Sequence, residues 1–251
     1  MWLCELITGN RKTYGMNLIG GVRRDITSEQ KPKILEVVGK IESQLKEIID
    51  AILGDTTLHL RLKDVGVLTK DAARQFCPVG PTVRGSGIAI DSRVNHPYAA
   101  YSEIPPQVIT QSDGDIWART IVRLLETLES INMVRRAMRE MPGGEIMSDV
   151  QEIPPGQEGI SYIEAPRGEC MHYVITGPDN RPYRWRVRAP SYMNLQSVPA
   201  MLMGYSVADA PIIIGSIDPC FSCTERLEVV DTRTNKARIY TQKELLALSK
   251  R

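Results

Sequence analysis

Residues 29–53 read EQKPKILEVVGKIESQLKEIIDAIL and carry the strongest fold signal in the chain. Their apolar residues recur at spacings of three and four, which places them in one stripe along an amphipathic helix: Ile34, Val38, Ile41, Leu45, Ile48 and Ile52. Thr27-Ser28-Glu29 supplies capping groups before this stretch, and Gly54-Asp55 ends it. At ~1.5 Å per residue the helix would be roughly 37 Å long, so it needs a partner of similar length.

A second helix of the same kind is predicted over residues 115–141. Its stripe consists of Trp117, Ile121, Leu124, Leu128, Ile131, Val134 and Met138, and Pro142-Gly143-Gly144 ends it. The charged residues between these positions, among them Arg119, Arg123, Glu126 and Glu129, are interpreted as a solvated face. Two long apolar stripes bury each other best as an antiparallel pair or bundle, which makes the predicted fold mainly helical.

Shorter elements surround this pair. One or two helical turns are expected at Lys70–Gln75, and Gly80-Pro81-Thr82-Val83-Arg84-Gly85-Ser86-Gly87 reads as a loop. After a Gly/Pro-rich linker, strands are predicted at Ser161–Ile175 and Tyr183–Ala189, joined by a turn at residues 177–180. A short helix at Asn194–Met203 and a β-branched strand at Ala210–Ile217 follow. The predicted class is α+β, with a small antiparallel sheet after residue 158.

Composition narrows the function classes. With 31 basic and 30 acidic side chains, the formal charge of the 251 residues is +1, which argues against a nucleic-acid binder. Arg184, Arg186 and Arg188 alternate with aromatic and apolar residues, and a strand with one wet face explains that pattern as well as an acidic partner does. No apolar run is long enough to span a bilayer, and no secretory signal is seen. The five cysteines form no disulfide framework, so a cytoplasmic location is expected.

Two thiols form the sharpest local feature, Asp218-Pro219-Cys220-Phe221-Ser222-Cys223-Thr224-Glu225-Arg226. A Cys-x-x-Cys turn can direct two sulfurs at one metal, but a closed zinc or iron–sulfur site needs four ligands. The other cysteines, Cys4, Cys77 and Cys170, are expected to be small buried hydrophobic residues. Cys170 and His172 share a strand face by alternation alone, and His59 and His96 have no companion motif.

A second short motif is Glu164-Ala165-Pro166-Arg167-Gly168-Glu169. Pro166 and Gly168 fix a tight turn that holds the Arg167 guanidinium on a rigid backbone. A permanently charged, five-donor group suits an anionic site. An ordinary surface arginine in a turn fits the same letters.

Five motifs in the same order resemble those of one enzyme family. The first is segment 8–17 together with 20–25, and the others are 80–87, 164–169, Arg188-Ala189-Pro190-Ser191 and 218–226. Together they resemble the large subunit of membrane-bound, energy-converting (group 4) NiFe hydrogenases of the formate hydrogenlyase type. All of these motifs except the cysteine pair also resemble those of the related 49-kilodalton quinone-site subunit of complex I. The resemblance covers essentially the whole chain.

The resemblance implies roles for individual residues. Cys220 would be a terminal nickel ligand and Cys223 a ligand bridging nickel and iron, the iron carrying carbon monoxide and cyanide. Arg167, positioned by Pro166, would lie over the open coordination site, with Asp218 as the carboxylate beside it. The reaction implied is heterolytic cleavage or formation of H₂, with Cys220 sulfur or Arg167 taking the proton. The electrons would pass to an iron–sulfur cluster in a separate small subunit.

One departure from the family is serious. The family site also uses an N-terminal Cys-x-x-Cys, which this sequence lacks. The missing half is therefore expected as a separate polypeptide, a product of a split gene, or a segment lost to a late reading-frame start. The expected partners are this N-terminal half, the iron–sulfur small subunit and membrane subunits, which would hold the chain at the cytoplasmic face of the membrane. Two alternatives stay open: a non-catalytic or quinone-site subunit of a complex I-like assembly, and a zinc-binding structural module.

The C-terminal tail is the last feature. The expected hydrogenase domain is residues 1–226, and residues 227–251 form an extension. In the resembled family a maturation endopeptidase removes such an extension after nickel is loaded, and the matching point here follows Arg226. A retained tail, with a strand at Val229-Val230 and a helix at Lys243–Ser249, is the alternative.

Overall fold

The computed structural model describes residues 1–12, 14–150, 152–224, 229–231, 233–234, 236–238 and 241–248. The chain falls into two compact units, Met1–Pro219 and Cys220–Arg251. No helix within the described ranges is both long enough and apolar enough to cross a membrane.

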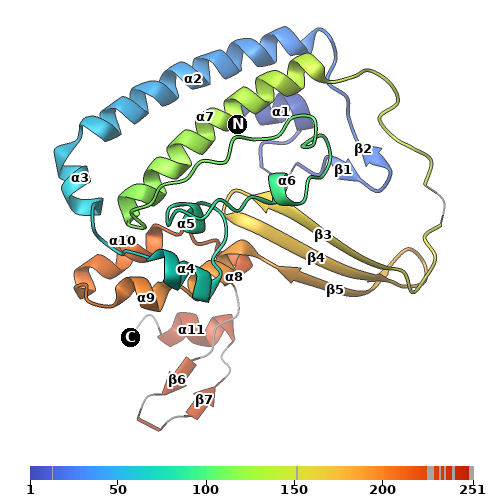
Figure 1. Ribbon diagram of the computed structural model, residues 1–251. Helices are drawn as coiled ribbons and strands as arrows, with labels where there is room; N and C mark the ends of the chain where they lie inside the picture. Colours follow the sequence, from blue (N-terminus) through green and yellow to red (C-terminus); the bar gives the residue numbers. More distant parts are fainter. Residues whose placement is uncertain are drawn as a thin grey trace. The chain divides into compact units, whose positions relative to one another are not determined.

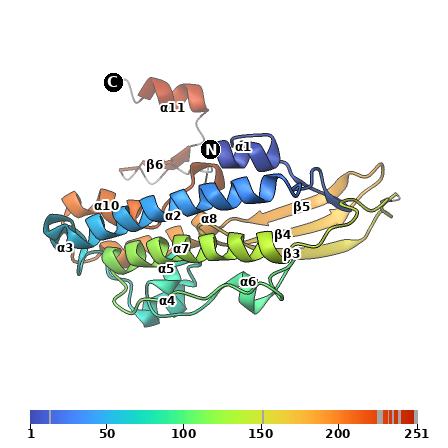
Figure 2. The same cartoon turned by 90° about the horizontal axis from the view of Figure 1, so that it is seen from above.

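Two long helices dominate the first unit. They are α2 (Gln30–Gly54) and α7 (Ile116–Glu140), and they lie side by side and antiparallel (Figures 1 and 2). Near the start of α2, Ile34 and Val38 are buried against Ile131 and Met138 of α7. Side chains of α1 (Trp2–Thr8) join the same cluster. Both predicted helices and their pairing are therefore confirmed.

The predicted faces of these helices are only partly right. On α2, Ile41 and Ile48 are 40% and 53% exposed, so its stripe is not covered along its whole length. On α7, Arg119 is fully buried, and its guanidinium donates to the carbonyls of Gly114 (2.7 Å) and Gly66 (2.9 Å). The solvated-face interpretation is wrong for Arg119, because its guanidinium bonds protein groups, the third being the Ser216 hydroxyl at 3.0 Å, instead of water. Besides α2, α7 also contacts α3 (Thr56–Leu62) and α5 (Pro81–Arg84).

A second core lies where short helices gather at the start of α7. Its buried side chains include Leu62, Leu68, Ile116, Met201 and Ile213. The helices are α4 (Lys70–Phe76), α8 (Pro190–Leu195), α9 (Val198–Leu202) and α10 (Ala210–Gly215), with a 3₁₀ turn η1 at Val207–Asp209. The predicted helix at Lys70–Gln75 is confirmed, and the single helix predicted at Asn194–Met203 is two helices.

The strand predicted at Ala210–Ile217 is wrong, because this segment is helix α10. Ser206 and Asp209 form a reciprocal capping box just before it, and Pro211 stands in its first turn. Both features favour a helix start, and they override the β-branched isoleucines.

The antiparallel sheet after residue 158 has the order β3-β4-β5, with β3 at Glu158–Ala165, β4 at Gly168–Thr176 and β5 at Pro182–Arg188. The long strand predicted at Ser161–Ile175 is therefore two strands joined by a turn. The turn predicted at residues 177–180 is confirmed, with Asp179 and Asn180 at positive φ. The one-wet-face interpretation of β5 is wrong, since Tyr183 and Trp185 are 79% and 58% exposed.

The remaining elements are short. A two-stranded ribbon, β1 (Asn17–Leu18) and β2 (Gly21–Val22), occupies the glycine-rich N-terminal region. The predicted loop at residues 80–87 contains helix α5, and α6 (Ser92–Asn95) follows it. In the second unit the structure describes η2 (Phe221–Cys223), β6 (Val229–Asp231), β7 (Lys236–Arg238) and α11 (Gln242–Leu248).

Candidate functional site

The turn between β3 and β4 presents Arg167. Ala165 pairs with Gly168 in the hairpin register, which leaves Pro166 and Arg167 as the two turn residues. Gly168 has φ +124° and Gly80, before α5, has φ +68°. A Cβ on Gly80 would lie 2.5 Å from the Arg167 carbonyl oxygen, and one on Gly168 would lie 2.6 Å from the Gly80 nitrogen. The two backbones therefore touch where only glycine fits.

Asn194 of α8 locks this contact. Its side chain is fully buried, accepts a hydrogen bond from the Val79 N–H at 2.8 Å and donates to the Arg167 carbonyl at 3.1 Å. One amide thus ties the segment before α5 to the turn that carries Arg167. The backbone of Arg167 is fixed from two sides.

The Arg167 side chain binds Asp218. Its Nε donates to the Asp218 carbonyl at 2.6 Å, and its Nη2 donates to the carboxylate Oδ1 at 3.1 Å. Asp218 has φ +54°, a conformation that few residues other than glycine, asparagine and aspartate adopt. Two acceptors on one residue set the direction of the guanidinium plane. The structure thus brings together Pro166, Arg167 and Asp218, three of the residues that the sequence points to.

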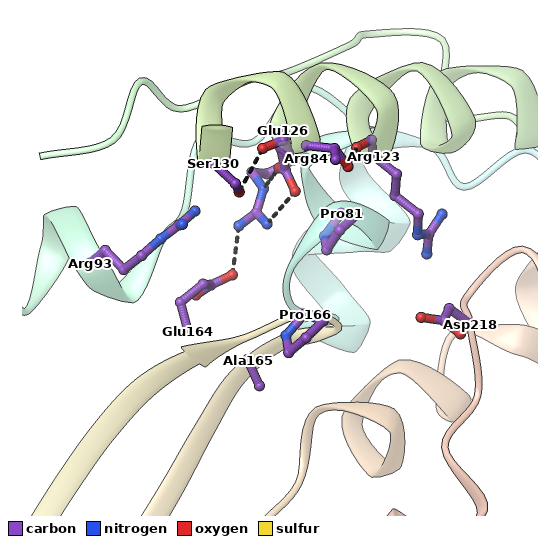
Figure 3. Close-up of a pocket in the computed structure, with 11 residues that line it drawn as sticks. Pro81, Arg84, Arg93, Arg123, Glu126, Ser130, Glu164, Ala165, Pro166 and Asp218 are labelled. Atoms are coloured by element: carbon purple, nitrogen blue, oxygen red, sulfur yellow. Dashed lines mark hydrogen bonds and ion pairs between the residues drawn. The ribbon is translucent and has the colours of Figure 1, made fainter. Parts of the chain in front are cut away.

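A cleft of about 360 Å³ runs from Asp218 and Pro166 to a cluster of charged side chains. It is lined by residues of α5, α6, α7 and the end of β3, as Figure 3 shows. Arg123 and Asp218 lie at one end, and Arg84, Glu126 and Glu164 lie toward the other.

Arg84 is the centre of the charged cluster. Its side chain is 2% exposed, its Nε and Nη2 donate to the two carboxylate oxygens of Glu126 at 2.5 and 3.2 Å, and its Nη1 donates to Glu164 at 2.8 Å. Burial lowers the pKa of Arg84, but the two carboxylates outweigh it and leave that pKa above its ordinary value. Glu164, 5% exposed, has a raised pKa because burial disfavours its charged form.

Arg123 lies between this cluster and Asp218. Its Nη1 donates to the Arg119 carbonyl at 3.2 Å, while its Nη2 is buried with no hydrogen-bond partner among the described residues. Burial lowers the pKa of Arg123, and the nearby Asp218 opposes that effect. A buried arginine donor turned to the cleft favours an anionic group there.

The two cysteines of the Cys-x-x-Cys motif stand in one turn of the second unit. Cys223 N–H donates to the Cys220 carbonyl at 3.0 Å across η2, and Cys220 Sγ lies 3.1 Å from the Ser222 hydroxyl. That Arg167 faces the same cavity as these thiols stays a prediction. Arg226, the expected processing position, lies outside the described residues.

The other cysteines differ from their prediction as buried residues. Cys77 is exposed, and Cys4 and Cys170 are only partly buried. Alternation along β4 does place Cys170 and His172 on one face, with Sγ and Nε2 3.5 Å apart. Within the described ranges, no group of three or more His, Cys, Asp or Glu side chains converges as metal ligands would.

The sequence alone does not reveal the roles of Arg84, Glu126 and Glu164. Arg84 and Glu164 stand inside recognisable motifs that assign them no role, and Glu126 reads as a solvated helix residue. The only local signal is an arginine followed by glycine in the 80–87 segment. Pairing with positions 42 and 80 residues away appears only in the folded chain.

Comparison with known proteins identifies relatives that match nearly the full length of this chain. Formate hydrogenlyase subunit 5 of Escherichia coli K12 is 39% identical over 245 residues, which cover 98% of this chain and 43% of the relative. Membrane-bound hydrogenase subunit alpha of Pyrococcus furiosus is 39% identical over 267 residues, 99% of this chain and 62% of the relative. The chain thus spans about half the length of these relatives.

Relatives also come from the quinone-dependent side of the family. One subunit of the NADH-quinone oxidoreductase of Dehalococcoides mccartyi is 34% identical over 218 residues, 86% of this chain and 59% of the relative. Residues 1–158 and 149–226 match the family described as "Respiratory-chain NADH dehydrogenase, 49 Kd subunit". The chain therefore belongs to the complex I 49-kDa family, which includes the large subunits of membrane-bound hydrogenases.

Proposed function

We propose that this chain is part of the catalytic subunit of a membrane-associated NiFe hydrogenase complex that interconverts H₂ with protons and electrons. The observation that carries the proposal is the Arg167–Asp218 contact, because Asp218 begins the Asp-Pro-Cys-x-x-Cys motif and Arg167 comes from a distant turn. An arginine bound to the residue that begins a cysteine motif fits an anionic, thiolate-rich centre.

The donor set fits half of a nickel–iron centre. Cys220 and Cys223 offer two soft thiolates from one turn, and such ligands suit nickel and low-spin iron. Two further thiolates would have to come from outside these 251 residues. When bound, the centre would supply heterolytic H₂ chemistry. The iron–sulfur small subunit would exchange the electrons.

The remaining roles belong to this chain's side chains. Cys220 and Cys223 would hold the metals, and Arg167 supplies a fixed cation that Asp218 and the Pro166 turn orient. Cys220 sulfur or Arg167 would take the proton. Membrane subunits would hold the complex at the cytoplasmic face of the membrane, a placement supported by the name of the Pyrococcus relative, a membrane-bound hydrogenase subunit.

The second candidate function is a quinone-site or non-catalytic subunit of a complex I-like assembly. The 34% identity to a subunit of a NADH-quinone oxidoreductase supports it. A zinc-binding module that uses Cys220 and Cys223 is the third candidate. Metal analysis of the complex purified through this chain separates the three candidates. Nickel with iron supports the hydrogenase, and zinc alone supports the structural module. The absence of both nickel and zinc supports the quinone-site subunit.

The direct test is Cys220→Ser in the intact complex. We expect loss of hydrogen turnover and of bound nickel, because a serine hydroxyl is a hard, protonated donor that cannot replace a thiolate. Cys77→Ser makes the same change on an exposed cysteine of the first unit and should leave both unchanged. Full turnover in Cys220→Ser would show that Cys220 is not a metal ligand and would contradict the proposed metal site.

A further inference from the structure

The charged cluster at one end of the cleft holds more carboxyl groups than guanidinium groups. Asp91, Glu126 and Glu164 surround Arg84 and Arg93, and the side chains of Asp91, Arg84 and Glu164 are 1%, 2% and 5% exposed. With every group ionised, this set of five carries a net charge of −1, and Arg123 of α7 is the next cation along the cleft. Burying an uncompensated charge is costly, and a carboxyl group avoids the cost by binding a proton.

The three carboxyl groups are not equally stabilised as anions. Asp91 receives two guanidinium donors from Arg93, at 2.7 and 2.9 Å. Glu126 receives two from Arg84 and is 18% exposed, so water also solvates it. Each of these two carboxylates therefore receives two guanidinium donors.

Glu164 is the least stabilised of the three. It receives one guanidinium donor, from Arg84 Nη1 at 2.8 Å, and the backbone N–H of Ser92 at 3.0 Å. Burial raises the pKa of Glu164. Of the three carboxyl groups, that of Glu164 therefore binds a proton most readily.

Other polar groups packed around Glu164 do not change that ranking. The Tyr98 hydroxyl accepts the Glu164 backbone N–H at 3.0 Å, and Ser92 turns its own hydroxyl to Glu169, which pairs with Arg188. On α7, Arg123 also faces the cleft, toward its Asp218 end (Figure 3).

The position of Glu164 links the cluster to the proposed catalytic end. It stands on β3 immediately before Ala165 and Pro166, and all three line the same cleft as Asp218. A volume of about 360 Å³ exceeds the roughly 30 Å³ that one water occupies in the liquid. Water can therefore fill the space between the two ends and carry protons along it.

We propose that Glu164 is the proton-carrying residue of this cleft, accepting protons released at the Asp218–Arg167 end and passing them to water through the partly exposed Glu126 side. The inference rests on the proposed function. Each H₂ gives two protons and two electrons, and the electrons leave for the iron–sulfur partner. One proton at a time adds to a Glu164 carboxylate oxygen, and the resulting neutral acid then releases it to water. In H₂ formation the same transfers run in reverse.

The test is Glu164→Gln in the intact complex, read in two ways. In infrared difference spectra across a pH titration, the wild type should show the C=O stretch of a buried protonated carboxyl, and the variant should lack it. The formation of HD from H₂ in D₂O should fall by ~10²-fold, the usual contribution of a positioned proton carrier, while nickel content stays unchanged. Glu129→Gln is the control, since Glu129 lies on α7 and accepts the Gln107 N–H at 2.9 Å.

The possible outcomes separate this inference from the proposed function. A carboxyl signal that persists in Glu164→Gln, or that disappears in Glu126→Gln alone, overturns the assignment. A wild-type complex that exchanges no hydrogen would contradict the proposed function. The infrared signal would still show whether Glu164 holds the proton. Where Glu164→Gln does not assemble, Glu164→Asp retains an acid and should keep a shifted signal with partial exchange; no signal there contradicts the proposal.

Discussion

At the scale of single residues, Arg167 is defined by two donors that reach one neighbour. Nε and Nη2 bind the carbonyl and the carboxylate of Asp218. An ammonium on a flexible stem cannot reproduce that fork. We therefore expect Arg167→Lys to keep its nickel and iron but to lose hydrogen turnover by ~10²-fold or more, the scale of a lost preorganised donor.

Metal content and turnover of the same preparation test that expectation together. Arg184→Lys, on an exposed position of β5, is the matched substitution and should behave as wild type. Equal turnover in Arg167→Lys would take Arg167 out of the mechanism, and loss of nickel would make its role structural.

The sequence identifies some of these residues and not others, for a physical reason. Asp218, Pro166 and Arg167 stand in compact motifs whose turn residues are visible as letters. Arg84, Glu126 and Glu164 interact only because α5, α7 and β3 converge in the folded chain. Their spacing along the sequence therefore does not predict the cluster. Arg119 shows the same limit: a charge on a helix is usually solvated, and only the packed neighbours of α7 reveal that this one is buried.

At the scale of elements, the contact between Gly80 and Gly168 holds the Arg167 turn against α5. A Cβ on Gly80 would lie 2.5 Å from backbone atoms of residues 167 and 168, which cannot rotate away, and φ at Gly80 is +68°. We expect Gly80→Ala to destabilise the protein by ~2–4 kcal/mol, combining left-handed strain with a backbone collision. The midpoint of chemical unfolding measures this change.

The control for that substitution is Gly39→Ala. Gly39 lies inside α2, and an added Cβ there would meet no atom within 4 Å. Alanine is the better helix former, so this variant should gain ~0.5–1 kcal/mol. A Gly80→Ala variant as stable as the wild type would mean that the turn and α5 do not touch.

The helix pair should show a pH dependence that one carboxylate accounts for. Hydrogen bonds from Arg135 of α7 and from Lys46 hold the pKa of Glu42 at about 2, below its ordinary 4.5. A depressed carboxyl pKa adds stability above the unfolded-state value, and that stability is lost as the pH falls toward the folded-state value. The difference in unfolding midpoint between wild type and Glu42→Gln should therefore shrink from pH 5 to pH 2.

Glu47→Gln removes the same charge from an exposed position of α2 and serves as the comparison. A difference between wild type and Glu42→Gln that stays constant over this range would show that the Glu42–Arg135 pair does not persist in solution.

Helices are easier to predict than strands in this chain because of their length. Two stripes of about seven turns each leave no doubt about period, since residues 30–54 and 116–140 repeat at 3.6 many times. The run Pro211-Ile212-Ile213-Ile214 is too short to separate a buried helix from a buried strand. There the capping box at Ser206 and Asp209 decides, and hydrophobic periodicity does not contain that signal.

At the scale of the whole molecule, removal of the tail beyond Arg226 stays a prediction. We expect an endopeptidase to remove residues 227–251 once nickel is loaded, because an uncut tail three residues beyond Cys223 would hold the cysteine turn open for metal insertion. Intact-mass measurement of the complex, purified with and without nickel in the growth medium, tests this. An active complex whose chain still ends at Arg251 rules processing out.

The exposed apolar side chains of α2 affect how much of this chain a cell can hold in solution. Ile41 and Ile48, two helical turns apart on one side, are 40% and 53% exposed. Apolar surface left in water attracts other such surface at ~25 cal/mol per Å². Surplus copies would adhere to one another or occupy chaperones. Synthesis in step with a partner that covers α2 would therefore limit this self-association.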